Sequence, residues 1–215
     1  LMMMQYNIRH LVVFDEKNEL CGVITDQDLL LSQGHSPVFL MHEIQVAPSV
    51  EETGILLKKL PNVVKSLLDA GARAEHVNHI ITAISDATVE KIVHLAVAQA
   101  GPPPADFAFL IMGSEGRKEQ TLKTDQDNAI VYEDVGPDKE AETRTYFLQL
   151  GEQICKWLDQ AGFALCDYDI MARNPKWCQP VSAWKNNFRQ WIYQAEPQTL
   201  LFASIFFDFR LGAGS

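Results

Sequence analysis

The 215-residue sequence has few of the features that mark a protein for a membrane, for secretion or for a nucleic acid. Its longest apolar stretches, such as residues 200–207, are far shorter than the ~20 residues that a membrane-spanning helix needs. No charged start followed by an apolar core and a cleavage site is present, so we expect no signal peptide. Because the first residue is Leu, we expect a fragment of a longer chain. The net charge of -10 disfavours DNA or RNA as a partner, since affinity for their backbones depends on Lys and Arg.

Cysteine is also scarce, and its spacing excludes the common metal motifs. The four cysteines are not arranged as Cys-x-x-Cys, and no histidines lie at zinc-ligand spacing from them. They are Cys21, Cys155, Cys166 and Cys178. We expect free thiols in a cytoplasmic protein. No internal repeat or low-complexity segment is visible, and a hydrophobic content of 47% can build one main domain with an appended piece.

One segment of the sequence indicates chemistry. Residues 107–112 form a short apolar run that ends at Gly113, the pattern of a buried strand. Gly113 allows a sharp turn and a close approach to a ligand, while Ser114 and Gly116 leave amides that can face phosphate oxygens. Arg117 adds a cation nearby. The segment therefore predicts a phosphate-binding loop.

A pair of carboxylates follows this loop. Asp125 and Asp127 are two residues apart and lead into the apolar run 129–132, so a strand would project both side chains from one face and Asn128 from the other. Two carboxylates on one face repel each other unless a cation compensates them, and oxygen ligands suit Mg²⁺. The alternative interpretation of the pair is a solvated start of a strand. For Arg117 the alternative is a surface ion pair with Glu115 or Glu119, both of which are in the same loop.

The combined pattern carries a resemblance. A Gly-Ser turn after a strand, followed by Asp-x-Asp before a second strand, is similar to the superfamily that includes DNA polymerase beta and the PII-protein uridylyltransferases. The longer string from Gly113 to Thr121, with residues 124–128, resembles the nucleotidyltransferase family related to the N-terminal domain of PII-protein uridylyltransferase and attached to CBS domains. The resemblance implies an α/β (α+β) fold of the polymerase-beta type with a small mixed sheet. It also implies that Asp125 and Asp127 hold Mg²⁺ or Mn²⁺ and that a nucleoside triphosphate is the substrate.

Superfamily members use a third carboxylate on a later strand. Residues 163–172 have the composition of a strand, and its alternation puts Asp167 and Asp169 on the same face, so periodicity does not choose between them. The resemblance of residues 170–175 to the family pattern favours Asp169 as the third catalytic residue and metal ligand. Lys118, where a small Gly is frequent in relatives, departs from the pattern.

The N-terminal segment resembles the second half of a CBS motif. Two apolar runs, residues 11–14 and 20–24, flank a polar turn and predict a hairpin, after which Thr25 is expected to cap a helix. The resemblance implies that Thr25 and Asp28 contact the phosphate and ribose of an adenine nucleotide. Simple capping and solvation is the favoured alternative, because the first half of the motif is missing.

These observations divide the chain into four parts. They are a CBS half-motif at 1–36, a helical segment at 37–101, a nucleotidyltransferase core at 102–179 and C-terminal helices at 180–215. Within the helical segment we expect separate helices over 76–84 and 89–98, the second with Ser85 as its N-cap. His76 and His79 lie three apart but lack a further ligand, so packing is the favoured interpretation. After the second strand of the core, residues 138–161 read as a long helix that ends at Gly162.

Two functions are consistent with the sequence. The leading one is a signal-transduction enzyme that transfers a nucleoside monophosphate from UTP or ATP to a hydroxyl of a protein or small-molecule acceptor, under control of the CBS domain. The other is a catalytically silent module that senses nucleotide. No His-Asp dipeptide for a phosphohydrolase is present, so a reverse reaction is not supported. We expect the exposed half-motif to favour a homodimer.

Overall fold

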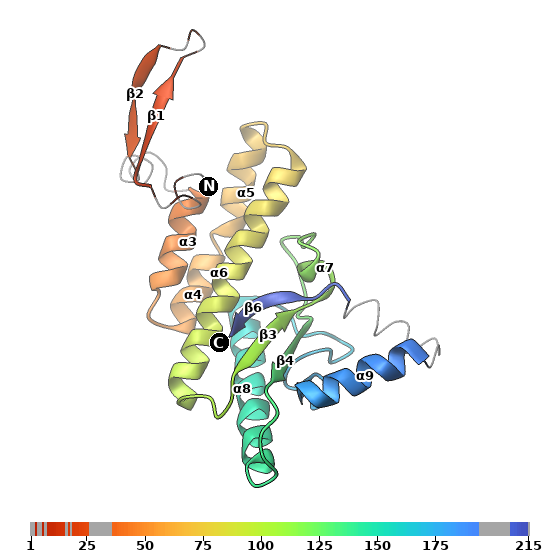
Figure 1. The fold of residues 1–215 in the computed structure, drawn as a ribbon. Helices are drawn as coiled ribbons and strands as arrows, with labels where there is room; N and C mark the ends of the chain where they lie inside the picture. The colour runs from red at the N-terminus through yellow and green to blue at the C-terminus, as the bar shows by residue number, and fades with distance from the viewer. Residues whose placement is uncertain are drawn as a thin grey trace.

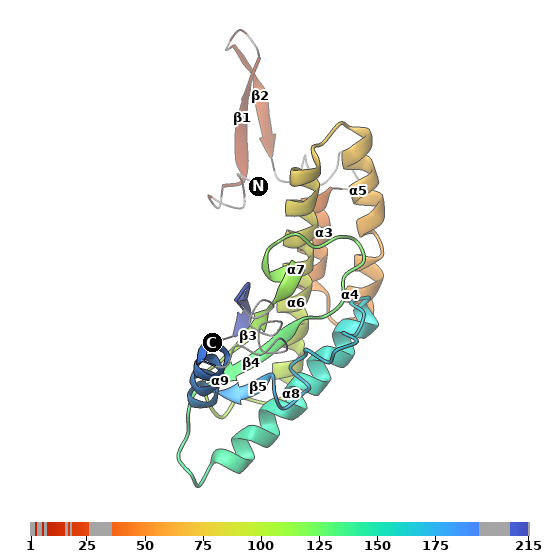
Figure 2. The same cartoon turned by 90° about the vertical axis from the view of Figure 1, so that its right-hand side faces the viewer.

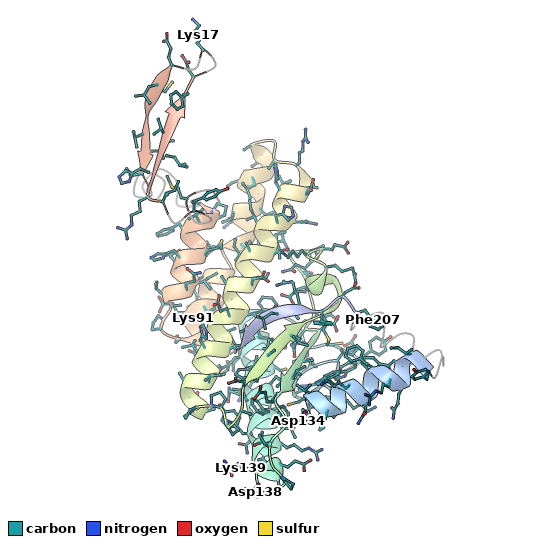
Figure 3. The ribbon with its side chains drawn as sticks, in the orientation of Figure 1. Lys17, Lys91, Asp134, Asp138, Lys139 and Phe207 are labelled. Atoms are coloured by element: carbon teal, nitrogen blue, oxygen red, sulfur yellow. The ribbon has the colours of Figure 1, made fainter. Side chains whose placement is uncertain are left out.

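The computed structural model describes residues 3, 6, 8–15, 17, 19–25, 36–193 and 207–214. At the N-terminal end, β1 (His10–Phe14) and β2 (Leu20–Thr25) form an antiparallel hairpin, as predicted. The hairpin projects away from the rest of the chain (Figure 1), with Lys17 at its tip (Figure 3). Val12 and Phe14 of β1 are each 54% exposed, so this half-motif leaves apolar surface uncovered. Asp28 and the helix expected after β2 lie outside the described residues.

A helical segment follows, consisting of α3 (Pro37–Val46), α4 (Val50–Leu57), α5 (Leu60–Asp69) and α6 (Ala74–Ala100). The Ser49 side chain caps α4 by accepting a hydrogen bond from the Glu52 amide at 3.2 Å. The prediction of two helices within residues 76–98 was wrong, because α6 runs through Ser85 without a break. No Gly or Pro interrupts this stretch, and Ser85 is buried in the helix interior.

The core is a four-stranded mixed sheet in the order β5-β4-β3-β6. These strands are β3 (Phe107–Ile111), β4 (Asn128–Tyr132), β5 (Cys178–Pro180) and β6 (Arg210–Gly214). β3 pairs antiparallel with β4 and β6, whereas β4 pairs parallel with β5. The expectation of an α/β fold with a mixed sheet is therefore confirmed.

Helices cover both sides of this sheet. Figure 2 shows α6 and α8 (Glu140–Ala161) on one side of the strands and α9 (Val181–Tyr193) on the other. Phe147 of α8 is fully buried and stacks on Tyr132 of β4 with ring centroids 4.5 Å apart. On the α9 side, the indole N–H of Trp184 donates to the carbonyl of Ile130 at 3.2 Å. Among the described residues, none of the helices combines the length and the apolar character that a membrane crossing requires.

Two features of the core differ from the prediction. The strand expected over residues 163–172 was wrong, because this segment is a loop that touches β-structure at one bridge, between Ala164 and Asp125. Both backbone and side-chain contacts hold the loop, since the Asn128 amide donates to the Ile170 carbonyl at 3.0 Å and the Asn128 side chain accepts a hydrogen bond from the Ala172 amide at 2.8 Å. Within the C-terminal part, α9 is helical as expected, but residues 210–214 form β6, an edge strand that the sequence did not predict.

Candidate active site

The turn after β3 lies directly against one carboxylate. Gly113 begins α7 (Gly113–Gly116) with φ at +61°, a conformation that favours glycine. A Cβ placed on Gly113 would lie 2.5 Å from Oδ2 of Asp127, so only a glycine lets this carboxylate approach. The backbone amide of Met112 also donates to the Asp127 carbonyl at 2.9 Å. The loop and the second strand are therefore joined at this point.

The amides of the loop are not equally available. The Gly116 amide donates to the Met112 carbonyl at 2.9 Å, and the Arg117 amide donates to the Gly113 carbonyl at 3.1 Å. The amides of Gly113 and Ser114 belong to the first turn of α7, where a helix offers no internal acceptor. The geometry therefore favours Gly113 and Ser114 over Gly116 as donors to a ligand. Gly116 has a steric role, because a Cβ there would overlap the carbonyl oxygen of Asp208.

Arg117 is committed to ion pairs in this structure. Its Nε lies 2.9 Å from Glu119 Oε2, and its Nη1 lies 2.8 Å from Asp208 Oδ2. The side chain is 43% exposed. The alternative interpretation, an ion pair with Glu119, thus describes the observed contacts, and the guanidinium would have to leave them in order to reach a phosphate.

Asp125 and Asp127 come together as the sequence predicts. One ligand atom from each lies within 4.8 Å of the other and of the Cys166 sulfur. The intervening Gln126 and the following Asn128 are buried and share the opposite face, where Nδ2 of Asn128 donates to Oε1 of Gln126 at 3.4 Å. Gln126 is further fixed by hydrogen bonds from its Nε2 to the Cys155 and Phe163 carbonyls. These inward side chains hold the two carboxylates on the outer face.

The electrostatics of this group fit a cation. Burial raises the pKa of Asp127, the hydrogen bond with Cys166 lowers it, and the nearby Asp125 carboxylate raises it further. Two carboxylates at this separation provide hard oxygen ligands, and a divalent cation would compensate their repulsion. Burial also raises the pKa of the Cys166 thiol, so the sulfur is present mainly as a neutral donor to Asp127. The residues present therefore fit a divalent metal.

Asp169 is placed differently from the prediction. It has a positive φ of 53°, and its Oδ1 accepts a hydrogen bond from Nε of Arg173 at 2.7 Å. The group of ligand atoms around Asp125 contains neither Asp169 nor the exposed Asp167, within the part of the chain that the structure describes. The expected equivalence of these two residues depended on a strand, and the strand is absent. Within the described residues, the third member of this group of ligand atoms is Cys166.

Three residues near the site were not predicted as functional. Cys166 approaches Asp127 because the 163–172 loop folds back on β4. Arg210 extends from β6 to the Gly113–Gly116 turn, where it donates to the Glu115 carbonyl. Glu115 is 5% exposed, and burial raises its pKa to about 7. A carboxylate within an otherwise small-residue turn was the one available signal for Glu115. Nothing local indicates the other two, because long-range packing places them.

Two known protein families match the chain. Residues 58–198 match the family described as Putative nucleotidyltransferase DUF294, which covers more than half of the chain. Residues 1–34 match the CBS domain. The chain therefore belongs to this nucleotidyltransferase family and carries an N-terminal CBS domain fragment. No curated protein matches the chain.

Proposed function

We propose that this protein transfers a nucleoside monophosphate from UTP or ATP to a hydroxyl group of a protein or small-molecule acceptor, in a reaction of the type that the PII-protein uridylyltransferases catalyse. The acceptor oxygen would form a bond to the α-phosphorus as the bond to the β-phosphate breaks, pyrophosphate would leave, and the hydroxyl proton would pass to a base or to solvent. The observation that carries the proposal is the contact between Gly113 and the Asp127 carboxylate, with Asp125 beside it. This contact puts a pair of metal-binding oxygens next to a turn with amides that have no partner inside α7. Family membership supports a nucleoside triphosphate as substrate.

The chain's own residues would divide the work of positioning. The amides of Gly113 and Ser114 would bind the β- and γ-phosphates, with Gly116 keeping the turn tight and Arg117 as a further phosphate contact after leaving its ion pairs. Asp125 and Asp127 would hold Mg²⁺ or Mn²⁺, which supplies charge neutralisation to the attacking and leaving oxygens. Fixing these groups before reaction is the main source of rate acceleration in such transfers. Asp169 could join them as the third carboxylate after its bond to Arg173 breaks.

The surrounding parts of the chain would provide regulation. We propose a polymerase-beta-like core at 102–179, preceded by the helical segment at 37–101 and followed by residues 180–215. Where a full CBS module is formed, Thr25 and Asp28 would contribute to its adenine-nucleotide site, and the uncovered apolar hairpin would pair in a homodimer. Such an arrangement fits a cytoplasmic signalling protein.

Incubation with UTP or ATP labelled in the α-phosphate tests the proposal. We expect label on an acceptor in the presence of Mg²⁺ or Mn²⁺, and its loss in an Asp125→Asn, Asp127→Asn double variant. Asp159→Asn is the matched control, because Asp159 lies exposed on α8 and is not among the ligand atoms grouped around Asp125. Persistence of label in the double variant would contradict the assignment of the site.

The second candidate is a catalytically silent nucleotide sensor, and the Asp169–Arg173 ion pair favours it. A sensor needs the loop and the Asp125–Asp127 pair but no third carboxylate. It would bind nucleoside triphosphate with Mn²⁺ in equilibrium dialysis and transfer no label to any acceptor. Under the enzyme hypothesis, Asp169→Asn should instead reduce transfer while leaving nucleotide binding intact.

A further inference from the structure

The last strand of the sheet reaches the loop at three points. Arg210 is paired with Ile111 in the β3–β6 ladder, so it lies beside the residues that lead into Gly113. Two residues earlier, the Asp208 carbonyl packs against Gly116, and the Asp208 carboxylate pairs with Arg117. Residues 208–210 lie C-terminal to the range 58–198 that the nucleotidyltransferase family matches.

Arg210 connects the loop to the long helix. Its Nε donates to the backbone carbonyl of Glu115 at 3.1 Å, and its Nη2 lies 2.5 Å from Oδ1 of Asp86 on α6. The two side chains of this ion pair are 18% and 34% exposed. The Arg117–Asp208 pair is more exposed on the arginine side, at 43%, and is therefore more fully screened by solvent. A planar guanidinium with several donors can bridge two acceptors in this way, which an ammonium group cannot do with the same geometry.

The charges around this contact give it a second role. Glu115 is buried, and its Oε1 has no hydrogen-bond partner among the residues that the structure describes. Burial raises its pKa most, the carboxylates of Asp86, Asp127 and Asp125 raise it further, and Arg210 lowers it. Arg210 thus offsets negative charge at the point where the loop packs against α6. Such compensation favours phosphate binding at this loop, because it reduces the repulsion between the carboxylates and the phosphate oxygens.

We infer that Arg210 is a positioning residue for the Gly113–Gly116 turn, fixing it through the Glu115 carbonyl while Asp86 anchors the guanidinium to α6. The inference rests on the proposed function in one respect, namely that the turn binds the triphosphate. Arg210 acts on the turn and not on the metal ligands, so its loss should weaken nucleotide binding and leave Mn²⁺ binding unchanged.

The test compares Arg210→Lys, Asp86→Asn and the control Arg189→Lys, an exposed arginine on α9. Hydrogen exchange by mass spectrometry measures the turn in residues 112–119, and this readout does not depend on activity. Equilibrium dialysis measures the binding of UTP and ATP, and electron paramagnetic resonance measures the binding of Mn²⁺. Lysine keeps the positive charge but lacks the planar set of donors of the guanidinium. Arg210→Lys therefore separates the positioning of the turn from the compensation of negative charge.

For Arg210→Lys we expect exchange in 112–119 to accelerate and the nucleotide Kd to rise, each by about tenfold, as for the loss of one hydrogen bond to a charged group. Asp86→Asn should shift both in the same direction, and Arg189→Lys should shift neither.

Unchanged exchange in Arg210→Lys would overturn the inference, and so would acceleration spread evenly over β3, β4 and β6. Faster exchange with an unaltered nucleotide Kd would also overturn it. If the wild-type protein binds neither nucleotide, the proposed function fails, and exchange in 112–119 alone then decides the role of Arg210.

Discussion

Glu115 should make the stability of this protein depend on pH in an unusual direction. Burial raises the pKa of Glu115 from 4.5 to about 7, with Asp86 as the second cause. Between these two values the folded protein holds a proton that the unfolded chain releases. Stability from this group is therefore fully present below pH 4.5 and is lost as the pH rises to about 7. Most paired carboxylates act in the opposite sense.

The magnitude follows from the shift. One pKa unit corresponds to about 1.4 kcal/mol, so a shift of this size gives a loss of about 3 kcal/mol between pH 4.5 and pH 7 or above. Replacing Glu115 by Gln removes the ionisation and keeps the shape of the side chain. The difference in unfolding free energy between Glu115→Gln and the wild type should thus grow by about 3 kcal/mol in favour of the variant over this range.

Urea unfolding at a series of pH values from 4.5 to 8 measures this difference. The samples should contain a chelator, because a cation held by Asp125 and Asp127 would remove part of the charge that acts on Glu115. Other ionisable groups are common to both proteins and cancel. Glu142→Gln, an exposed change on α8, is the matched control and should show no such trend. Parallel pH curves for the wild type and Glu115→Gln would refute the reasoning.

Three further changes test other parts of the structure. Gly113→Ala forces a Cβ toward Asp127 at a positive φ; it should cost about 1–3 kcal/mol in urea unfolding and weaken Mn²⁺ binding, and an unaltered Mn²⁺ affinity would contradict the contact. Phe147→Ala empties a fully buried site and should cost about 3–5 kcal/mol, whereas a loss below 1 kcal/mol in the same assay would disagree with its packing. Ser49→Ala removes the hydrogen bond to the Glu52 amide and should cost about 1 kcal/mol, with Ser49→Asp expected to restore stability because Asp caps equally well.

The sequence predicted those parts of the site that depend on neighbouring residues. The strand, the turn at Gly113 and the carboxylate pair follow one another along the chain, and the alternation of side chains correctly put Asn128 on the face opposite Asp125 and Asp127. The N-terminal hairpin was confirmed for the same reason, since two apolar runs and a polar turn are local signals.

The remainder depends on contacts between distant residues. Residues 163–172 have the composition of a strand, but they form a loop. The Ala172 amide donates to the Asn128 side chain and not to a neighbouring strand. β6 pairs with β3, although most of the core sequence separates the two strands. No local pattern could therefore indicate either β6 or the contact of Arg210 with Glu115. The continuity of α6 through Ser85 was missed because a serine is common at helix starts and is also tolerated in a buried helix.

The uninterrupted α6 has a consequence for how the molecule unfolds. Its first half, including Val77 and Ile84, packs in the apolar cluster of the helical segment, and its second half, including Ile92 and Ala96, packs in the cluster under the sheet. One rigid rod thus belongs to two cores. Unfolding of either core would remove apolar contacts from the same helix, so residues 37–193 should unfold in one cooperative transition. Proteolytic cleavage near the midpoint of α6 should therefore unfold both cores together.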